Sequence, residues 1–200
     1  MHLRAPAILL AARSHGETAS IARLLTEEFG VVAGYVAGGR GRRIRPLMIP
    51  GNLVELELSA RSDSQLPFAK LELLTSRGPW LTEPLPVAAI GWATALTATA
   101  LPERNPYPSL YHALAALLDA ICHAPSARGW ARAMLAYETL LLREMGYGGS
   151  PPPVAEDLPA ILAGLDRLAG PLDHYLLADR RGDVMSARAL LRDLLGRMNS

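Results

Sequence analysis

The densest group of cations in the chain is a run of arginines interleaved with glycines in residues 38–45, which we call the arginine segment. It contains Arg40, Arg42, Arg43 and Arg45. A guanidinium is permanently charged, and its paired N–H donors match two oxygens of a phosphate. Because unpaired arginines resist burial and glycine weakens a strand, we expect an exposed, flexible loop. Its glycines would let the backbone approach a ligand closely. The alternative is a solvated basic loop that binds nothing in particular.

The distribution of charge separates the first part of the chain from the rest. The 200 residues carry a formal net charge of +1, which alone says nothing about nucleic acid. Residues 1–78 contain ten Lys and Arg against seven Asp and Glu, whereas residues 79–200 contain ten against twelve. No acidic residue lies between Phe29 and Asn52. The basic excess therefore lies in the first part and is concentrated in the arginine segment. Lysine is nearly absent, so some of this arginine reflects overall composition.

Five short strands are predicted in the first part of the chain. They cover residues 6–13, 18–26, 31–37, 52–59 and 66–75. Residues 18–26 also fit a helix, but the turn that follows leads directly into another strand, which favours a strand here. A small closed barrel removes exposed strand edges, and the OB-fold has this strand count and size.

Two of these strands show alternation that predicts which side chains face the barrel core. In residues 52–59, Val54, Leu56 and Leu58 alternate with glutamates. In residues 66–75, the expected inward residues are Ala69, Leu71 and Leu73, with Lys70 and Glu72 outward.

The pattern becomes helical after residue 78. Helices are expected at residues 87–101, 109–123, 128–145, 158–168 and 186–198, with a shorter one at 172–177. The sequence therefore predicts an α+β protein. A five-stranded OB-fold barrel, residues 1–78, precedes an all-α helical domain, residues 79–200. A Gly- and Pro-rich linker, residues 148–153, lies within the helical domain.

Signals for catalysis, metals or membranes are weak. There is no phosphate-binding loop with its lysine, and no nucleophile elbow. Cys122 and His123 are adjacent, and neighbouring helix side chains do not face one another. His112 and His174 have no second ligand at metal spacing, so we predict no catalytic residue, cofactor or zinc. No apolar run is long enough to span a membrane, no signal peptide is recognised, and a single cysteine fits a reducing cytoplasm.

Aromatic residues are scarce in the predicted barrel. It contains only Phe29, Tyr35 and Phe68, while Trp80, Trp92 and Trp130 lie outside and are expected in the core. Barrels that bind single strands often stack bases on aromatic rings. Binding here should therefore be phosphate-dominated, sequence-tolerant and salt-sensitive. Four arginine contacts to single-strand phosphates would contribute a log–log salt slope of about −3, at ~0.7 per contact.

Residues 1–149 resemble a known family. The shared features are the turn before Gly16-Glu17-Thr18, the turn at residues 26–30, and the strand running into residues 38–42. The similarity continues through residues 50–56 and returns at residues 137–148. On these motifs the chain resembles the bacterial recombination-mediator and DNA-repair RecO family, and residues 165–200 match only loosely.

The resemblance implies an OB-fold on a helical domain without catalytic activity on small molecules. It implies binding to single- and double-stranded DNA, annealing of complementary strands, and work with RecR to load RecA. It also implies docking of the C-terminal tail of SSB, the single-stranded-DNA-binding protein, and a cytoplasmic, nucleoid-associated location. Many members carry a cysteine-rich, sometimes zinc-binding insertion after the Gly-Tyr-Gly motif. Here residues 149–153 contain no cysteine, so zinc is not carried over.

Residue roles follow from the resemblance as expectations. The DNA contacts would be Arg40, Arg42, Arg43 and Arg45, with Arg13, Arg23 and Lys70 as weaker candidates on the barrel face. The acidic SSB tail would bind Arg128 and Arg132 beside Trp130, unless these arginines merely solvate a helix face. An RNA-binding OB module and a protein-interaction scaffold stay open as alternative functions.

Overall fold

The computed structural model describes residues 2–62, 65–148, 157–178 and 184–198. The chain divides into two compact units. We call Met1–Leu81 with Leu101–Tyr111 the barrel unit, and Thr82–Ala100 with His112–Ser200 the helical unit. The expected boundary at residues 78 and 79 lies near the end of the first stretch of the barrel unit. Except for Gly148, the expected linker falls outside the described residues.

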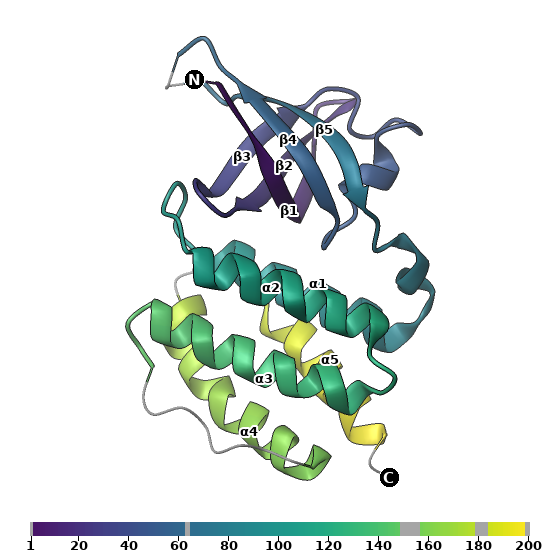
Figure 1. The fold of residues 1–200 in the computed structure, drawn as a ribbon, viewed down its shortest axis with the longest axis vertical. Coiled ribbons are helices and arrows are strands. Elements are labelled where there is room, and N and C mark those ends of the chain that lie inside the picture. The colour runs from purple at the N-terminus through teal and green to yellow at the C-terminus, as the bar shows by residue number, and fades with distance from the viewer. Residues whose placement is uncertain (1, 63–64, 149–156, 179–183, 199–200) are drawn as a thin grey trace. The chain divides into compact units, whose positions relative to one another are not determined.

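The barrel unit contains five strands in the order β1-β2-β3-β5-β4, closed into a barrel (Figure 1). The strands are β1 His2–His15, β2 Ala19–Thr26, β3 Gly30–Val36, β4 Leu53–Ser59 and β5 Phe68–Thr75. All neighbouring pairs are antiparallel except β3 with β5, which pair in parallel where Tyr35 meets Phe68. The predicted class, a five-stranded OB-fold-like barrel followed by helices, is confirmed.

Strand β1 is longer than predicted because it pairs with two other strands, β2 and β4. Its first half, from His2 to Ile8, pairs with β4, and its later part, from Ala7 to His15, pairs with β2. The register shifts between Leu9 and Ala11, as at a β-bulge. A bulge bends a strand and increases its twist, and this lets one long strand pair along both of its edges in a closed barrel.

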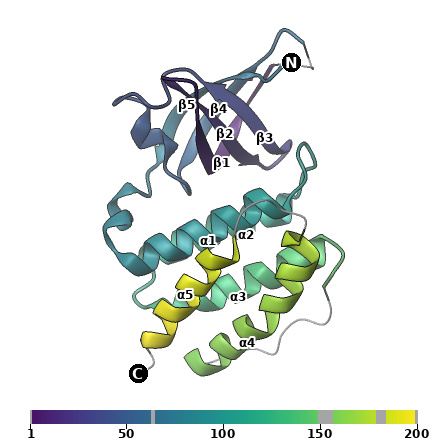
Figure 2. The ribbon, with the colours of Figure 1, turned by 180° about the vertical axis from the view of Figure 1, so that it is seen from behind.

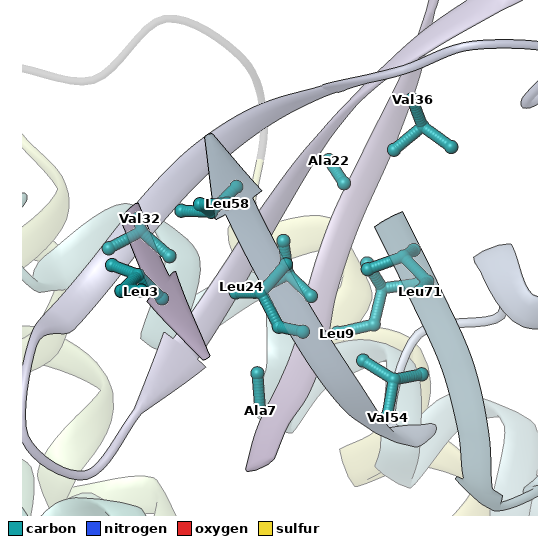
Figure 3. Close-up of a cluster of buried hydrophobic side chains, with 11 residues drawn as sticks. Leu3, Ala7, Leu9, Ala22, Leu24, Val32, Val36, Val54, Leu58 and Leu71 are labelled. Carbon is teal, nitrogen blue, oxygen red and sulfur yellow. The ribbon is translucent and has the colours of Figure 1, made fainter. Parts of the chain in front are cut away.

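The barrel is filled by aliphatic side chains from all five strands (Figure 3). Val54, Leu56 and Leu58 of β4 are fully buried, which confirms the predicted alternation there. On β5 the prediction was wrong at one position: Leu71 is buried, but Leu73 is 42% exposed. The register of β4 with β5 shifts between Leu53 and Val54. Since Leu73 pairs with Val54 and Leu71 with Leu56, Leu73 lies on the same face of the sheet as Leu71, and the shift comes only after it, at Leu74.

The helices lie close to their predicted positions (Figures 1 and 2). They are α1 Pro84–Ala100, α2 Pro108–His123, α3 Ala127–Glu144, α4 Leu158–Pro171 and α5 Met185–Arg197. Short helical turns η1 Arg45–Met48 and η2 Gly78–Thr82 are 3-10 helices, and η3 Leu172–Leu177 is a π-helix that follows α4 directly. Trp92 and Trp130 are buried in the core, as expected, and Trp80 is half-buried.

A buried ion pair joins four helices of the helical unit. Arg188 of α5 donates through Nε and Nη2 to the two carboxylate oxygens of Glu138 on α3, at 3.0 and 2.7 Å. Trp92 Nε1 of α1 donates to the same carboxylate at 2.8 Å, and Arg188 also donates to the Leu165 carbonyl of α4. Burial raises the pKa of the Glu138 carboxyl, and the Arg188 and Trp92 donors oppose that rise. Nothing in the local pattern of the sequence predicted this cluster.

Candidate nucleic-acid interface

The arginine segment is held against the barrel by Ile44 and by two apolar residues of η1, which follows it. Ile44, Leu47 and Met48 pack against the barrel core cluster. The backbone is hydrogen-bonded: Ile44 and Arg45 N–H donate to the Gly41 carbonyl, and Leu47 N–H donates to the Ile44 carbonyl. The segment is therefore exposed, as predicted, but it forms bonded turns that lead into η1 rather than an open loop. The apolar side chains pack on the core, whereas the neighbouring arginines are at the surface.

Two of the glycines in the segment have structural roles. Gly38 has φ +65°, a left-handed conformation that side-chain-bearing residues rarely adopt. Gly39 is buried, and a Cβ there would lie 2.7 Å from the Cβ of Ser20 on β2. These glycines let the segment turn sharply and lie closely against β2, a role that the sequence analysis assigned instead to contact with a ligand.

All four arginines of the segment are exposed. Arg40 Nη1 donates to the carbonyl oxygens of Gly16 and Glu17 at 3.4 and 2.9 Å, so its side chain is braced against the β1–β2 turn. In the part of the chain that the structure describes, no carboxylate forms an ion pair with Arg42, Arg43 or Arg45. Their donors are available to an external anion.

Two surface grooves collect most of the predicted DNA-contact residues. The β1 groove, about 380 Å³, is lined by Ala12, Arg13, Ser14, Ser20, Gly39, Arg40 and Arg45. The β5 groove, about 520 Å³, contains Arg43 and Lys70 together with Glu57 and Phe68. The fold thus brings Arg13 of β1 and Lys70 of β5 to the grooves that the arginine segment lines, although they lie far from it in sequence. Arg42 lines neither groove.

Arg23 has a different environment. Its Nη1 lies 2.6 Å from Glu103 Oε1, and the pair is partly exposed. Glu103 belongs to residues 101–111, which return to the barrel unit and bridge β3 at Val31. Arg23 therefore has an internal carboxylate partner, unlike the arginines of the segment.

Three aromatic rings form a contact chain across the same unit. Tyr35 and Phe68 meet edge-to-face with ring centroids 5.3 Å apart, and Tyr35 meets His15 in the same way at 5.9 Å. Phe68 is 61% exposed. The arrangement of Tyr35 and Phe68 could not be predicted from the sequence, because the parallel pairing of β3 with β5 leaves no local signal.

In the helical unit, Arg128 and Arg132 are exposed one turn apart on α3. Trp130 between them is 3% exposed and faces the core. It therefore does not form the apolar side of a surface notch beside these arginines.

The described ranges contain neither a metal-binding cluster nor a membrane-spanning helix. No group of three or more His, Cys, Asp or Glu residues there is arranged to hold a metal ion. Among those residues, too, no helix has the length and apolar character needed to cross a membrane.

Comparison with known proteins places both units in one family. Residues 1–77 match the family described as Recombination protein O N terminal, and residues 83–150 match Recombination protein O C terminal. The chain belongs to the RecO family.

Named RecO relatives agree with this. The DNA repair protein RecO of Rhodospirillum centenum is 45% identical over 143 residues, which cover 71% of this chain and 56% of the relative. The protein of the same name from Ruegeria sp. is 42% identical over 149 residues, covering 74% and 61%. That of Caulobacter vibrioides is 41% identical over 144 residues, covering 71% and 58%. The aligned part thus spans little more than half the length of these RecO proteins.

Proposed function

We propose that this RecO-family chain binds DNA through the arginine segment of its barrel unit, as a non-enzymatic recombination mediator. The observation that carries the proposal is the set of exposed guanidiniums, Arg42, Arg43 and Arg45, without a carboxylate partner among the described residues. Apolar anchors position them, and the β1 and β5 grooves place Arg13 and Lys70 alongside. A polyanion satisfies all of these charges together.

The chemistry of the site favours the nucleic-acid backbone over base edges. Guanidiniums at the rim of open grooves grip phosphate oxygens and carry no sequence information. Binding should therefore be sequence-tolerant and should release counterions, so affinity falls steeply as salt rises. Single and double strands both present this backbone.

Fluorescence anisotropy with a labelled single strand across a salt series tests the proposal. Replacing Arg42, Arg43 and Arg45 together by Ala should make the log–log salt slope shallower by about 2, at ~0.7 per phosphate contact. The matched control is Arg197→Ala, which removes an exposed arginine of α5. An unchanged salt slope in the triple variant would exclude the arginine segment as the DNA-binding site.

Family membership supports a more specific role. RecO relatives are named DNA repair proteins, and we infer that this chain anneals complementary strands and works with RecR to load RecA onto SSB-coated single strands. Annealing of two labelled complementary strands, measured by the quenching of fluorescence between their labels, tests the first activity. Co-sedimentation with RecR, with and without DNA, tests the second. The arginine-to-alanine variant should lose annealing.

The SSB tail is proposed to bind at Arg128 and Arg132. Their exposure on one face of α3 suits an acidic peptide. A labelled SSB tail peptide should bind more weakly to the Arg128→Glu and Arg132→Glu double variant. The same peptide without its terminal apolar residue serves as the control. If wild type and the double variant bind the peptide equally, Arg128 and Arg132 are not the tail-binding site.

The same assays separate two other functions. An RNA of equal length that outcompetes DNA would indicate an RNA-binding module, since the 2′-OH is the group that distinguishes the two. Salt-independent binding to RecR without any DNA shift would indicate a protein-interaction scaffold.

A further inference from the structure

Phe68 is an exposed aromatic ring in the barrel unit. It is the first residue of β5, and 61% of it is exposed, more than any other large apolar residue of the described chain. Its edge-to-face contact with Tyr35 uses at most one face of the ring. A phenylalanine left in water forgoes the free energy of burial, and the free face of this ring, beside a cationic groove, is open to a flat apolar group.

Phe68 stands between two hollows that each contain a cation. On one side is the β5 groove with Arg43 and Lys70, where Glu57 leaves one net positive charge. On the other is a hollow of about 490 Å³, which we call the hairpin hollow, lined by Ser59, Ala60, Arg61, Gln65, Leu66 and Phe68. Phe68 and Ser59 line both hollows. A flat apolar group on the ring would therefore have cations on both sides.

We propose that Phe68 is a stacking platform for an unpaired base, with flanking phosphates taken by Arg43 and Lys70 on one side and Arg61 on the other. This proposal rests on the DNA-binding function proposed above and adds a base contact to it. An unpaired base offers a π-face, whereas a base inside a duplex is already stacked on its neighbours. The platform thus favours single strands, and stacking on one ring contributes ~5- to 100-fold in affinity.

A purely structural role for Phe68 makes a different prediction. The Tyr35–Phe68 bridge closes the barrel between β3 and β5, and Tyr35 N–H donates to the Pro67 carbonyl at 2.8 Å. If the ring only supports this closure, removing it weakens every ligand alike. Base stacking instead makes the loss depend on whether the ligand has bases.

The test compares a thymine oligonucleotide with an abasic one of the same length, which keeps the phosphates and removes the bases. Anisotropy at one low salt concentration gives the ratio of the two affinities. Wild type should bind the thymine strand at least ~5-fold more tightly than the abasic strand. Phe68→Ala and Phe68→Leu should bring this ratio close to one while the affinity for the abasic strand stays the same. Phe68→Trp should keep the ratio.

Leu74→Ala is the matched control, because Leu74 is an exposed apolar residue on the same strand, at 51% exposure. It should keep the wild-type ratio. The platform is wrong if wild type does not distinguish the two strands, if Phe68→Leu keeps the ratio, or if Phe68→Ala weakens both strands equally. In these cases DNA binding through arginines stands. If wild type binds neither strand, the proposed function itself fails.

Discussion

Arginine has opposite environments in helix α5 and in the arginine segment. In α5 of the helical unit, Arg188, Arg192 and Arg197 pair with Glu138, Asp166 and Asp193 at 2.7, 2.7 and 2.6 Å. In the arginine segment of the barrel unit, Arg42, Arg43 and Arg45 have no carboxylate partner among the residues that the structure describes. The comparison teaches that a count of arginines says little about binding until their partners are known.

The difference has a cause in the distribution of acids. Helices α3, α4 and α5 supply the three carboxylates that face the arginines of α5. Residues 30–51 contain no acid, and the side chains that anchor the segment are aliphatic. Ion pairs within the chain stabilise the fold, whereas exposed cations without a carboxylate partner are free to bind an external anion. The following predictions test this contrast, beginning with the largest effect.

Removing the buried carboxylate should destabilise the protein most. Glu138→Ala leaves Arg188 charged at 6% side-chain exposure, and stranding one partner of a buried pair costs about 3–5 kcal/mol. Urea denaturation measures the loss. If the stranded charge is the cause, adding Arg188→Met should recover more than half of it. Failure of the double variant to recover any stability would show that the hydrogen bonds, rather than the charge, matter.

Reversing the unpaired arginines should abolish tight DNA binding without unfolding the protein. Arg42, Arg43 and Arg45 changed together to Glu should lower single-strand affinity by about 100-fold or more at low salt. The free energy of unfolding should change by less than about 0.5 kcal/mol per site, because these residues are exposed. The control reverses Arg128, Arg132 and Arg167, three exposed arginines of the helical unit. Equal losses in both triple variants would mean that net charge, and not the arginine segment, controls binding.

Single substitutions within the barrel unit compare an arginine without a carboxylate partner with one that is paired. Arg43→Ala removes an arginine that lines the β5 groove and should weaken single-strand binding by about 3- to 10-fold at low salt. Arg23→Ala removes an arginine that already pairs with Glu103, so its effect should stay below about 2-fold. Anisotropy titrations of both variants show which substitution weakens DNA binding more. The reverse order would place the DNA along β2 instead.

The smallest effect is expected at an exposed pair. Arg192 donates two hydrogen bonds to Asp166 and lowers the pKa of that carboxyl. Because the folded pKa is below the unfolded one, this stabilisation is present above the unfolded value of about 3.9 and is lost as the pH falls through the folded pKa. Asp166→Asn should cost less than about 1 kcal/mol at neutral pH. Urea curves of wild type and variant should converge in acid, and a gap that persists there would rule out the ion pair as its cause.

Local patterns predicted the elements of this fold well. The alternation of Val54, Leu56 and Leu58 placed β4 correctly because every second residue of a strand shares a face. Residues 18–26 were read as a strand against a competing helical pattern, and β2 is there. Leu73 lies on the predicted face, opposite Val54, but it is 42% exposed, because alternation predicts the face of a residue and not what covers that face.

Long-range pairings were beyond local patterns. Glu138 and Arg188 are fifty positions apart, and no local pattern links them. The contact of Tyr35 with Phe68 likewise depends on barrel closure. Such pairs are brought together only by packing of elements, which no periodicity within one element encodes.

By itself, the sequence determined where the strands and helices lie, that the arginine segment cannot be buried, and that no acid nearby in the chain neutralises it. Those outcomes follow from residue chemistry and local spacing, which act over a few residues. Only the tertiary structure decided which arginines remain unpaired, that Ile44, Leu47 and Met48 anchor the segment, and that Phe68 stands exposed between two cationic hollows. An ion pair or a groove is made by groups distant in sequence, and only folding brings them within reach of one another.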